Sequence, residues 1–308
     1  MAENNFEGEG REFRCGFIAL VGRPNTGKST LLNRILDTKI AITSAKPQTT
    51  RNRITGILNG EDYQAIFLDT PGINVKKGLM RSHLVKIALS TLNYADIVLF
   101  IIDAKAGIKK DDIVILDKIE KVDAMKILLI NKIDLLKKEE LLPLIDSLKK
   151  YEFIEEFIPI SAKRGTNLKR LISVVVDNLP IAPRYFEADI ITDRPEEFLF
   201  AEYIREKIYR LLQEELPYCV HVEVEEIKER KEGLIYVSAN IFVEKESQKG
   251  IIIGKKGEMI KEIGSRARKD IEYFTGCKVY LDLRVYVKKK WTENEKLLHK
   301  YGYTSDEN

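Results

Sequence analysis

The feature that most constrains this chain is the segment from Gly22 to Ser29, GRPNTGKS, which fits the pattern G-x-x-x-x-G-K-[ST]. It follows an apolar run at 16–21 and precedes a helical pattern at 28–36, so it connects a predicted strand to a predicted helix. Its glycines let backbone amides approach phosphate oxygens, and the helix N-terminus adds a positive end. A chance glycine-rich turn is the alternative, and the flanking elements argue against it. The segment therefore predicts a phosphate-binding loop.

The length and composition exclude several classes of protein. The 308 residues, 44% hydrophobic and 32% charged, suit two soluble globular domains. There is no apolar run of about eighteen residues and no signal-peptide pattern, so we expect an intracellular protein. The three cysteines, Cys15, Cys219 and Cys277, have no paired spacing and predict neither a disulfide framework nor a zinc site.

Residues 13–180 are predicted to form one α/β domain. Apolar runs at 16–21, 53–58, 63–68, 97–102, 126–130 and 157–160 alternate with helical patterns at 28–36, 79–93, 110–120, 138–149 and 168–179. This alternation predicts a mostly parallel sheet with helices on both faces. Asn59 and Gly60 lie between the second and third runs and predict a hairpin, so the sheet should be mixed.

Three short motifs each follow a predicted strand of this domain. They are Asp69-Thr70-Pro71-Gly72, Asn131-Lys132-Ile133-Asp134 and Ser161-Ala162-Lys163. Each alone is an ordinary turn or loop sequence. Together with the loop at 22–29, in this order and at strand ends, they argue against coincidence and predict one binding site.

Asp134 is predicted to select the base. Its carboxylate can accept from two adjacent donors of guanine, whereas adenine would present an acceptor and no exocyclic amine. A buried carboxylate left unpaired costs about 1 to 3 kcal/mol or more, so ATP should be excluded. Ser161 to Lys163 would pack on the base and give a backbone amide to the guanine oxygen. The predicted ligands are GTP or GDP with Mg²⁺.

With these motifs, residues 13–179 resemble the P-loop GTPases of the translation-factor class, the group that includes Ras. The resemblance implies a GTP-hydrolysing switch and suggests Thr50 as the switch threonine that reaches magnesium and γ-phosphate, with Thr49 as the alternative. The residues expected to hold Mg²⁺ are Ser29, Thr50 and Asp69. The residues expected to take part in catalysis are Lys28, Thr50 and Gly72. The full expected nucleotide set is Gly22, Arg23, Pro24, Asn25, Thr26, Gly27, Lys28, Ser29, Thr30, Asp69, Thr70, Pro71, Gly72, Ile73, Asn131, Lys132, Ile133, Asp134, Ser161, Ala162 and Lys163.

Ile73 departs from the Ras pattern, in which a glutamine after the glycine of Asp-x-x-Gly orients the attacking water. An aliphatic side chain cannot hold a water, so we expect turnover at or below about 10⁻⁴ to 10⁻² per second. Asn25 resembles the asparagine with which some bacterial GTPases help to hold a potassium ion beside the phosphates. It is otherwise an ordinary loop residue.

The second half of the chain has a different organisation. Prolines at 180, 183 and 195 predict a linker at 181–196. Residues 197–291 follow the order α-β-β-α-β, with helical patterns at 197–216 and 259–274 and alternating runs at 221–230, 234–244 and 279–287. A short helix is expected near Lys249, and tails are expected at 1–12 and 292–308.

The segment Gly254-Lys255-Lys256-Gly257 precedes the second of these helices. Such glycines permit close approach of a nucleic-acid backbone, and lysines neutralise its phosphates. Residues 246–290 hold twelve Lys or Arg against six Asp or Glu, so this region is basic although the chain carries only +3. A glycine-bounded turn is the alternative, but the order of elements resembles a type II KH domain, which implies single-stranded RNA. The candidate contacts are Ile253, Gly254, Lys255, Lys256, Gly257, Met259, Arg266 and, unless they form a solvated edge, Lys288 and Lys289.

Over nearly its whole length the sequence resembles the Era family of bacterial GTPases. The resemblance implies that the KH domain binds the 3′ end of small-subunit ribosomal RNA and that the protein acts in assembly of the small ribosomal subunit. It also implies peripheral contact at the inner face of the cell membrane, but the sequence has no lipidation signal or strongly amphipathic basic anchor, so any such contact should depend on weak surface charge. We expect a cytoplasmic monomer. The alternative is a non-catalytic GTP-dependent RNA-binding regulator. Because switch loops order around the γ-phosphate, we expect GTP to alter the contacts of residues 179–195 and hence RNA access.

Overall fold

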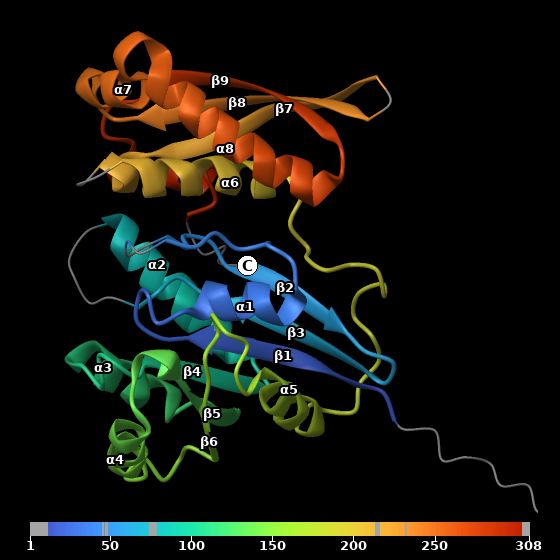
Figure 1. The fold of residues 1–308 in the computed structure, drawn as a ribbon. Helices are drawn as coiled ribbons and strands as arrows, with labels where there is room; N and C mark the ends of the chain where they lie inside the picture. The colour runs from blue at the N-terminus through green and yellow to red at the C-terminus, as the bar shows by residue number, and fades with distance from the viewer. Residues whose placement is uncertain are drawn as a thin grey trace, which may run out of the picture.

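The computed structural model of the protein describes residues 12–44, 46, 49–73, 79–212, 216–231 and 233–303. Two domains lie one above the other and are joined by a single extended linker (Figure 1). The first domain contains β1 (Arg14–Val21), α1 (Lys28–Leu36), β2 (Ile54–Asn59), β3 (Tyr63–Asp69), α2 (Leu79–Ser90), β4 (Ile97–Asp103), α3 (Lys110–Ile119), β5 (Met125–Asn131), α4 (Lys138–Leu148), β6 (Glu156–Pro159) and α5 (Leu168–Asp177), with 3-10 turns η1 (Thr91–Tyr94) and η2 (Ile133–Leu135).

The sheet of this domain has the order β2-β3-β1-β4-β5-β6; β2 is antiparallel to β3, and the other neighbouring strands in this order are parallel to each other. The central strand β4 has the sequence IVLFIID and is buried on both faces, as expected for a strand covered by helices on each side. Helices α1 and α5 pack on one face, and α2, α3 and α4 pack on the other (Figure 1). The predicted mixed sheet with helices on both faces is confirmed.

The second domain contains α6 (Glu196–Leu211), η3 (Leu216–Cys219), β7 (His221–Lys231), β8 (Leu234–Val243), α7 (Glu246–Ile253), η4 (Lys255–Gly257), α8 (Glu258–Thr275) and β9 (Lys278–Val287). Its sheet has the order β7-β8-β9, with β7 antiparallel and β9 parallel to β8. Helices α6 and α8 share one core with this sheet. The predicted smaller α+β domain is confirmed, and α7 is the short helix expected near Lys249.

Helix α6 lies between the two domains. Every residue from Leu199 to Tyr209 is buried, including the charged residues Glu202, Arg205, Glu206 and Lys207. A helix buried on all sides is covered by protein all round. One hydrophobic cluster accordingly includes Ile40 and Ile42 of the first domain together with Tyr203 of α6.

The expectation of a C-terminal tail at 292–308 is wrong within the described residues. A 3-10 turn, η5 (Trp291–Glu293), is followed by a helix, α9 (Glu295–Lys300), which Asn294 caps by accepting from the amide of Leu297. Trp291 is fully buried, and Tyr301 and Tyr303 pack with it against Met80 of α2. Aromatic burial therefore fixes this segment between the domains.

One expected helix boundary also differs, and the linker has contacts that the sequence did not predict. The helix expected at 197–216 ends at Leu211, and Leu216 instead begins η3. The segment expected as a linker is hydrogen-bonded along the edge of the first sheet, because the amide of Ile57 in β2 donates to the carbonyl of Ile191 at 2.9 Å. The linker therefore protects an edge strand from pairing with other chains.

Candidate functional site

The phosphate-binding loop connects the end of β1 to the start of α1, as the sequence predicts. Gly27 has a φ of 104°, and a Cβ at that position would lie 2.2 Å from the side-chain nitrogen of Asn131. Any other residue would therefore be strained and would also clash. The amide nitrogens that begin α1 consequently lie against the Asn131 motif without an intervening side chain.

Lys28 is buried inside this loop. Its ammonium donates to the carbonyl oxygens of Gly22 at 3.1 Å and Arg23 at 3.0 Å. Burial lowers the pKa of Lys28 to about 8, although the nearby Asp69 carboxylate favours the charged form. A polyphosphate in the loop would add negative charge and stabilise the ammonium. Lys28 is thus placed to neutralise phosphate.

Three side-chain oxygens meet beside Lys28. The Ser29 hydroxyl donates to Asp69 Oδ2 at 2.6 Å and lies 2.9 Å from the Thr50 hydroxyl. Asp69 is fully buried, and burial raises its pKa to about 6 against the opposing effects of Lys28 and Ser29. Its Oδ1 is buried without a hydrogen-bond partner among the described atoms. Thr49 instead donates its hydroxyl to the carbonyl of Lys46. The geometry therefore favours Thr50 over Thr49 as the threonine that helps to hold the metal ion.

Asn131 holds three of the predicted motifs together. Its amide nitrogen donates to the carbonyl of Thr26 at 2.7 Å, and its oxygen accepts from the amides of Lys132 at 2.8 Å and Ala162 at 3.0 Å. Lys132 in turn donates to the carbonyl of Asn25 at 2.7 Å. Asn131 therefore positions the loops around the base, and its own groups are engaged by protein.

Asp134 has one carboxylate oxygen engaged and one placed for a ligand. Oδ1 accepts from the Ser161 hydroxyl at 2.6 Å, which orients the carboxylate. Among the residues that the structure describes, the partner of Oδ2 is the exposed Arg164, in an ion pair of 3.9 Å. This arrangement suits recognition of the two adjacent donors of guanine.

Two cavities adjoin each other at Gly27, Thr30 and Lys132. The first, about 330 Å³, lies on the phosphate and metal side and is lined by Pro24, Asn25, Gly27, Lys28, Ser29, Thr30, Ile42, Thr43, Ser44, Thr49, Thr50, Gly72 and Lys132. The second, about 230 Å³, lies on the base side and is lined by Gly27, Thr30, Asn131, Lys132, Asp134, Leu135, Ala162 and Lys163. The structure thus brings the motifs together as one elongated site.

Several predicted residues support this site without lining the cavities. Arg23 pairs with the buried Asp112 of α3 at 2.6 Å. Thr70 donates to the carbonyl of Leu20 at 2.8 Å. Ile73 is buried in a hydrophobic cluster and offers no polar group. The other predicted residues without a place in either cavity lining are Gly22, Thr26, Asp69, Pro71, Ile133 and Ser161.

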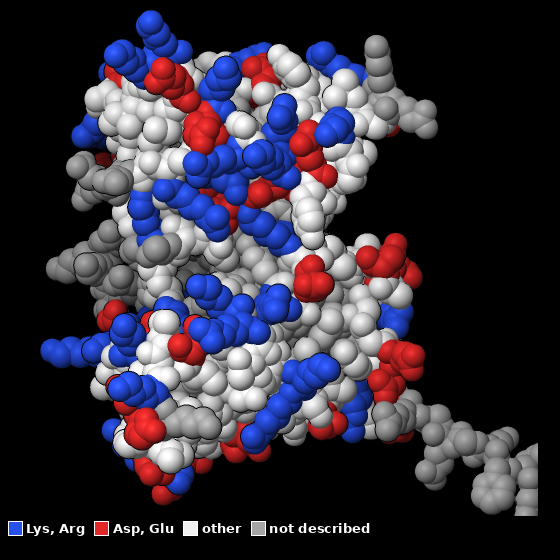
Figure 2. All heavy atoms as spheres, in the orientation of Figure 1, with Lys and Arg blue, Asp and Glu red and all other residues white. Residues whose placement is uncertain are grey.

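The sequence did not reveal that residues 42–44 line the phosphate cavity. They belong to a segment without regular secondary structure, so periodicity gives no signal there. It also did not reveal Arg51, which is 1% exposed and reaches the second domain. Figure 2 shows Lys and Arg side chains gathered on both sides of the hollow between the domains.

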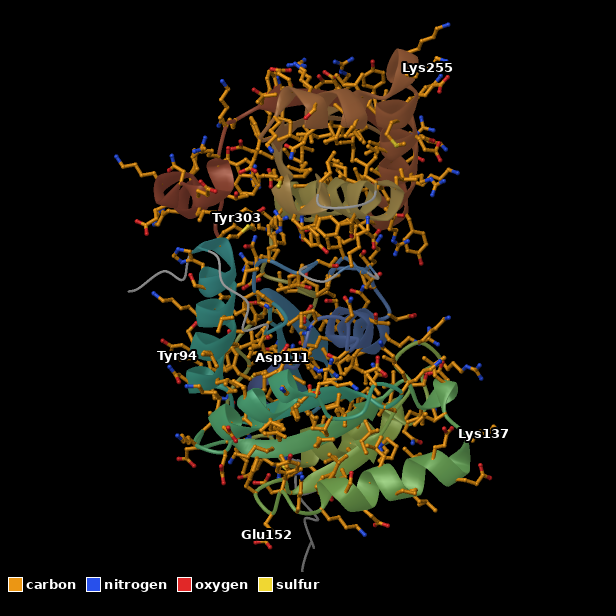
Figure 3. All side chains as sticks on the ribbon, turned by 90° about the vertical axis from the view of Figure 1, so that its left-hand side faces the viewer. Tyr94, Asp111, Lys137, Glu152, Lys255 and Tyr303 are labelled. Carbon is orange, nitrogen blue, oxygen red and sulfur yellow. The ribbon has the colours of Figure 1, made fainter. Side chains whose placement is uncertain are left out.

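The loop at 254–257 lies between α7 and α8. Gly254 has a φ of 74°, and a Cβ there would lie 2.6 Å from the Cβ of Met259, so only glycine fits. Lys255 and Lys256 are exposed, and Figure 3 places Lys255 at the end of this domain that faces away from the first domain. Ile253 and Met259 are partly buried and pack against the domain core.

The remaining RNA candidates differ in exposure. Arg266 is exposed and pairs with Glu262 of the same helix at 2.6 Å. Lys289 is exposed, whereas Lys288 is partly buried and donates to the Tyr301 hydroxyl at 3.0 Å. Lys288 therefore also serves the aromatic cluster of the C-terminal segment.

Comparison with known proteins matches residues 17–132 to the family described as "50S ribosome-binding GTPase" and residues 215–292 to "KH domain". The chain is 50% identical to the GTPase Era of Geotalea uraniireducens, over 95% of this chain and 99% of that one. It is 49% identical to the GTPase Era of Caldanaerobacter subterraneus, over 96% and 99%. The chain belongs to the Era family of GTPases.

Solved structures of Era have the same fold. One, of Era in complex with MgGDPNP and nucleotides 1506–1542 of 16S ribosomal RNA, has a TM-score of 0.92 at 41% identity and covers 95% of this chain and 100% of that chain. Another, of an Aquifex aeolicus Era variant bound to GDP·AlF4⁻, has a TM-score of 0.91 at 40% identity with the same coverage. As an Era-family member the chain is a GTP-hydrolysing enzyme with a KH domain, which excludes the alternative of a non-catalytic regulator. Within its described part, no helix is long and apolar enough to span a membrane.

Proposed function

We propose that this Era-family GTPase is a slow switch in which the site at the strand ends holds GTP with Mg²⁺. Ser29, Thr50 and Asp69 would hold the ion, which would supply charge neutralisation at the phosphates. Their oxygens suit a hard cation, and the unpartnered, buried Asp69 Oδ1 is the observation that supports an ion there. Lys28 and the amides of the loop at 22–29 would bind the phosphates, and Asp134 would select guanine.

Slow hydrolysis is supported by Ile73. This residue is 4% exposed and packs in the core, so no side chain orients water at the position where Ras-like proteins carry glutamine. The neighbouring Gly72 lines the phosphate cavity, so its backbone, rather than the Ile73 side chain, would face the γ-phosphate. Turnover of order ten per second from the isolated chain would contradict this proposal.

A potassium ion beside the phosphates is a further part of the proposal. Asn25 lines the phosphate cavity and has a φ of 65°, which holds its backbone in an uncommon conformation for a non-glycine residue. A monovalent cation there would add positive charge near the phosphates. Equal GTPase rates in potassium and sodium buffers would contradict this role.

We also propose that the KH domain binds single-stranded ribosomal RNA at the 3′ end of the small-subunit RNA and that the protein acts in assembly of the small subunit. The exposed Lys255 and Lys256, between two glycines at the outer end of the domain, are the observation that carries this proposal. The solved Era complex with 16S ribosomal RNA supports it, since that protein has the same fold.

Charge reversal of the loop tests the RNA proposal. Changing Lys255 and Lys256 to Glu should weaken binding of a 16S 3′-end oligonucleotide more than about tenfold and lower the salt slope by about 1 to 2. The matched control changes Lys149 and Lys150, which are exposed at the end of α4, to Glu. This control has the same net charge and should bind as the parent does. Equal weakening in both variants would show a general charge effect and remove the loop from the interface.

The proposed RNA target lies where ribosomes are assembled, so we propose a cytoplasmic location and a monomeric state. Contact with the inner face of the membrane would be peripheral and would depend on surface charge. Cell fractionation at low and high salt tests this point. Retention in the membrane fraction at high salt would contradict a purely electrostatic contact.

A further inference from the structure

The two residues that flank Thr50 are both held by the KH domain. On one side, the carbonyl of Thr49 accepts from the guanidinium of Arg205 in α6 at 2.6 Å. On the other side, the guanidinium of Arg51 donates to the carbonyls of Val220 and Tyr218, each at 2.8 Å. Thr50 itself faces the opposite way, toward Ser29. Both chain neighbours of the candidate switch threonine are therefore hydrogen-bonded to the KH domain.

Arg51 is deeply buried in the KH domain. It is 1% exposed, and a third hydrogen bond at 2.9 Å runs to the Tyr209 hydroxyl. Its guanidinium carbon lies 5.8 Å from the ring centre of Tyr209, 5.6 Å from that of Tyr303 and 6.0 Å from that of Trp291. A buried guanidinium stays charged, so its burial is tolerated only where acceptors and aromatic faces compensate for the lost water. We call this set, Tyr209, Tyr218, Val220, Trp291 and Tyr303, the Arg51 pocket.

The same segment has further attachments to the KH domain before Thr49. The amide of Thr43 donates to Glu206 at 3.0 Å, and the ammonium of Lys39 pairs with Glu206 at 2.6 Å. Lys46 donates to the carbonyl of Leu212. Because Glu206 has no exposed side-chain surface, these contacts also lie inside the domain interface. Lys39, Thr43 and Thr49 are thus each bonded to α6, and Lys46 to the residue that follows it.

The Arg51 pocket also contacts the start of α2. Trp291 and Tyr303 pack with Met80 at the start of α2, which follows the Asp69-to-Gly72 motif in the chain. Figure 3 places Tyr303 at the boundary between the two domains, beside α2. Arg51, which follows Thr50, and Met80 of α2 therefore contact the same aromatic cluster of the KH half.

We propose that Arg51 is a positioning residue for GTP hydrolysis, which acts by anchoring Thr50 to the KH domain. The proposal rests on the proposed role of Thr50 at the metal and γ-phosphate. Because Thr50 is adjacent to Arg51 in the chain, the buried and hydrogen-bonded Arg51 guanidinium restrains the backbone that carries Thr50. The KH domain thereby supplies, within the same chain, an anchor that keeps the switch segment in a GTP-competent position.

The proposed anchor should affect the affinity for GTP more than the affinity for GDP. GDP lacks the γ-phosphate, so its binding depends on the loop at 22–29 and on Asp134 and little on Thr50. Loss of the anchor should therefore weaken GTP relative to GDP and slow hydrolysis, with little change in GDP affinity. A purely structural role for Arg51 would affect both nucleotides alike.

The test uses the full chain with Arg51→Gln and, as matched control, Arg53→Gln, since Arg53 is an exposed arginine two residues away. Fluorescent GTP-analogue and GDP affinities and single-turnover rates are measured in Mg²⁺. We expect Arg51→Gln to lower the GTP-to-GDP affinity ratio and the hydrolysis rate about tenfold each. GDP affinity should stay within about twofold, and Arg53→Gln should match the parent. An unchanged ratio and rate in folded Arg51→Gln protein would overturn the proposal.

Two further variants keep the result interpretable. Thr50→Ala should lower the GTP-to-GDP ratio at least as much as Arg51→Gln; if it has no effect, the proposed role of Thr50 fails on its own. Should Arg51→Gln not fold, Tyr209→Phe removes one acceptor of Arg51 and keeps the ring. We expect about a threefold lower ratio from that change. An unchanged ratio in Tyr209→Phe, with Thr50→Ala showing its effect, would overturn the anchor.

Discussion

The two ends of the KH domain differ in their surroundings: the outer end carries an exposed loop, and the inner end packs against the GTPase domain. At the outer end, Lys255 and Lys256 are exposed on a short loop between glycines. At the inner end, Arg51 enters from the GTPase domain and is 1% exposed. Exposed lysines can meet a partner without rearrangement of the fold, whereas a buried guanidinium can leave only when its whole pocket changes. One domain thus combines an adaptable outer loop with a rigid inner contact.

The largest effect is expected from a mutation of Trp291, which would disrupt packing at the inner end of the KH domain. Its side chain is fully buried, and its indole nitrogen donates to the carbonyl of Cys219 at 2.9 Å. Trp291→Ala should lower the free energy of unfolding of the KH half by about 3 to 5 kcal/mol, because it leaves a cavity and an unpaired carbonyl. Urea unfolding measures this change. Tyr280→Ala, on the exposed face of β9 where Tyr280 is 60% exposed, is the control and should cost less than about 1 kcal/mol.

The next effect concerns guanine recognition in the GTPase domain. Asp134→Ala removes the charged acceptor and should weaken GTP and GDP alike by at least about a hundredfold, since hydrogen bonds to charged groups contribute about 1.5 to 3 kcal/mol each. Calorimetric titration measures both affinities. Asp123→Ala changes an exposed carboxylate and should leave them unaltered. A loss for GTP alone would contradict the assignment of Asp134 to the base.

The nucleotide site and the Arg51 pocket also differ in how far the sequence predicts them. The strands and the Asp69, Asn131 and Ser161 motifs could be predicted because each motif is contiguous and stands at a strand end. The Arg51 pocket could not, because its members lie up to 252 residues from Arg51 in the chain and none shows a local pattern. Long-range packing of single side chains leaves no periodic signal.

The C-terminal segment shows why the expectation of a tail was wrong. The run at 288–290 is basic and resembles a solvated strand edge, yet Lys288 lies 4.5 Å from the ring centre of Phe242 and Trp291 is fully buried. Asn294 before a helical stretch, followed by two tyrosines, was the available signal for a capped and packed helix. Aromatic residues near a terminus therefore argue for packing even where the charge is high.

A smaller effect tests the metal side. In the metal-free protein, burial raises the pKa of Asp69 from 3.8 to about 6, so ionising it costs stability as pH rises through this window. The net shift, in which Lys28 and Ser29 already oppose burial, corresponds to about 3 kcal/mol at neutral pH. Asp69→Asn should therefore stabilise the metal-free protein by about 3 kcal/mol at pH 7 and not at all below pH 3.8, while abolishing the Mg²⁺ dependence of GTP binding. Thermal unfolding across pH, with and without Mg²⁺, measures both effects. Lower stability of the variant at pH 7 would contradict this assignment.

The smallest expected effect on stability concerns Glu206 at the domain interface. Burial disfavours its charged form, but Lys39, Lys207 and the Thr43 amide outweigh burial and lower its pKa from 4.5 to about 2. A lowered pKa gives stability that is present above pH 4.5 and is lost as pH falls toward 2. Glu206→Gln should therefore be less stable than the parent by about 2 kcal/mol above pH 4.5, with the difference shrinking toward pH 2. Urea unfolding at several pH values tests this, and a constant difference would contradict the ion-pair explanation.

The comparison between the outer and inner ends leads to one direct measurement. If the inner contact transmits the nucleotide state to the outer loop, RNA affinity must depend on the nucleotide, and by linkage nucleotide affinity must depend on RNA. Binding of a single-stranded 16S 3′-end oligonucleotide should be measured with a GTP analogue, with GDP and without nucleotide. We predict a difference of at least about threefold between the GTP analogue and GDP, lost in Arg51→Gln. Equal RNA affinity in all three states would contradict the account of the protein as a switch that joins the two domains.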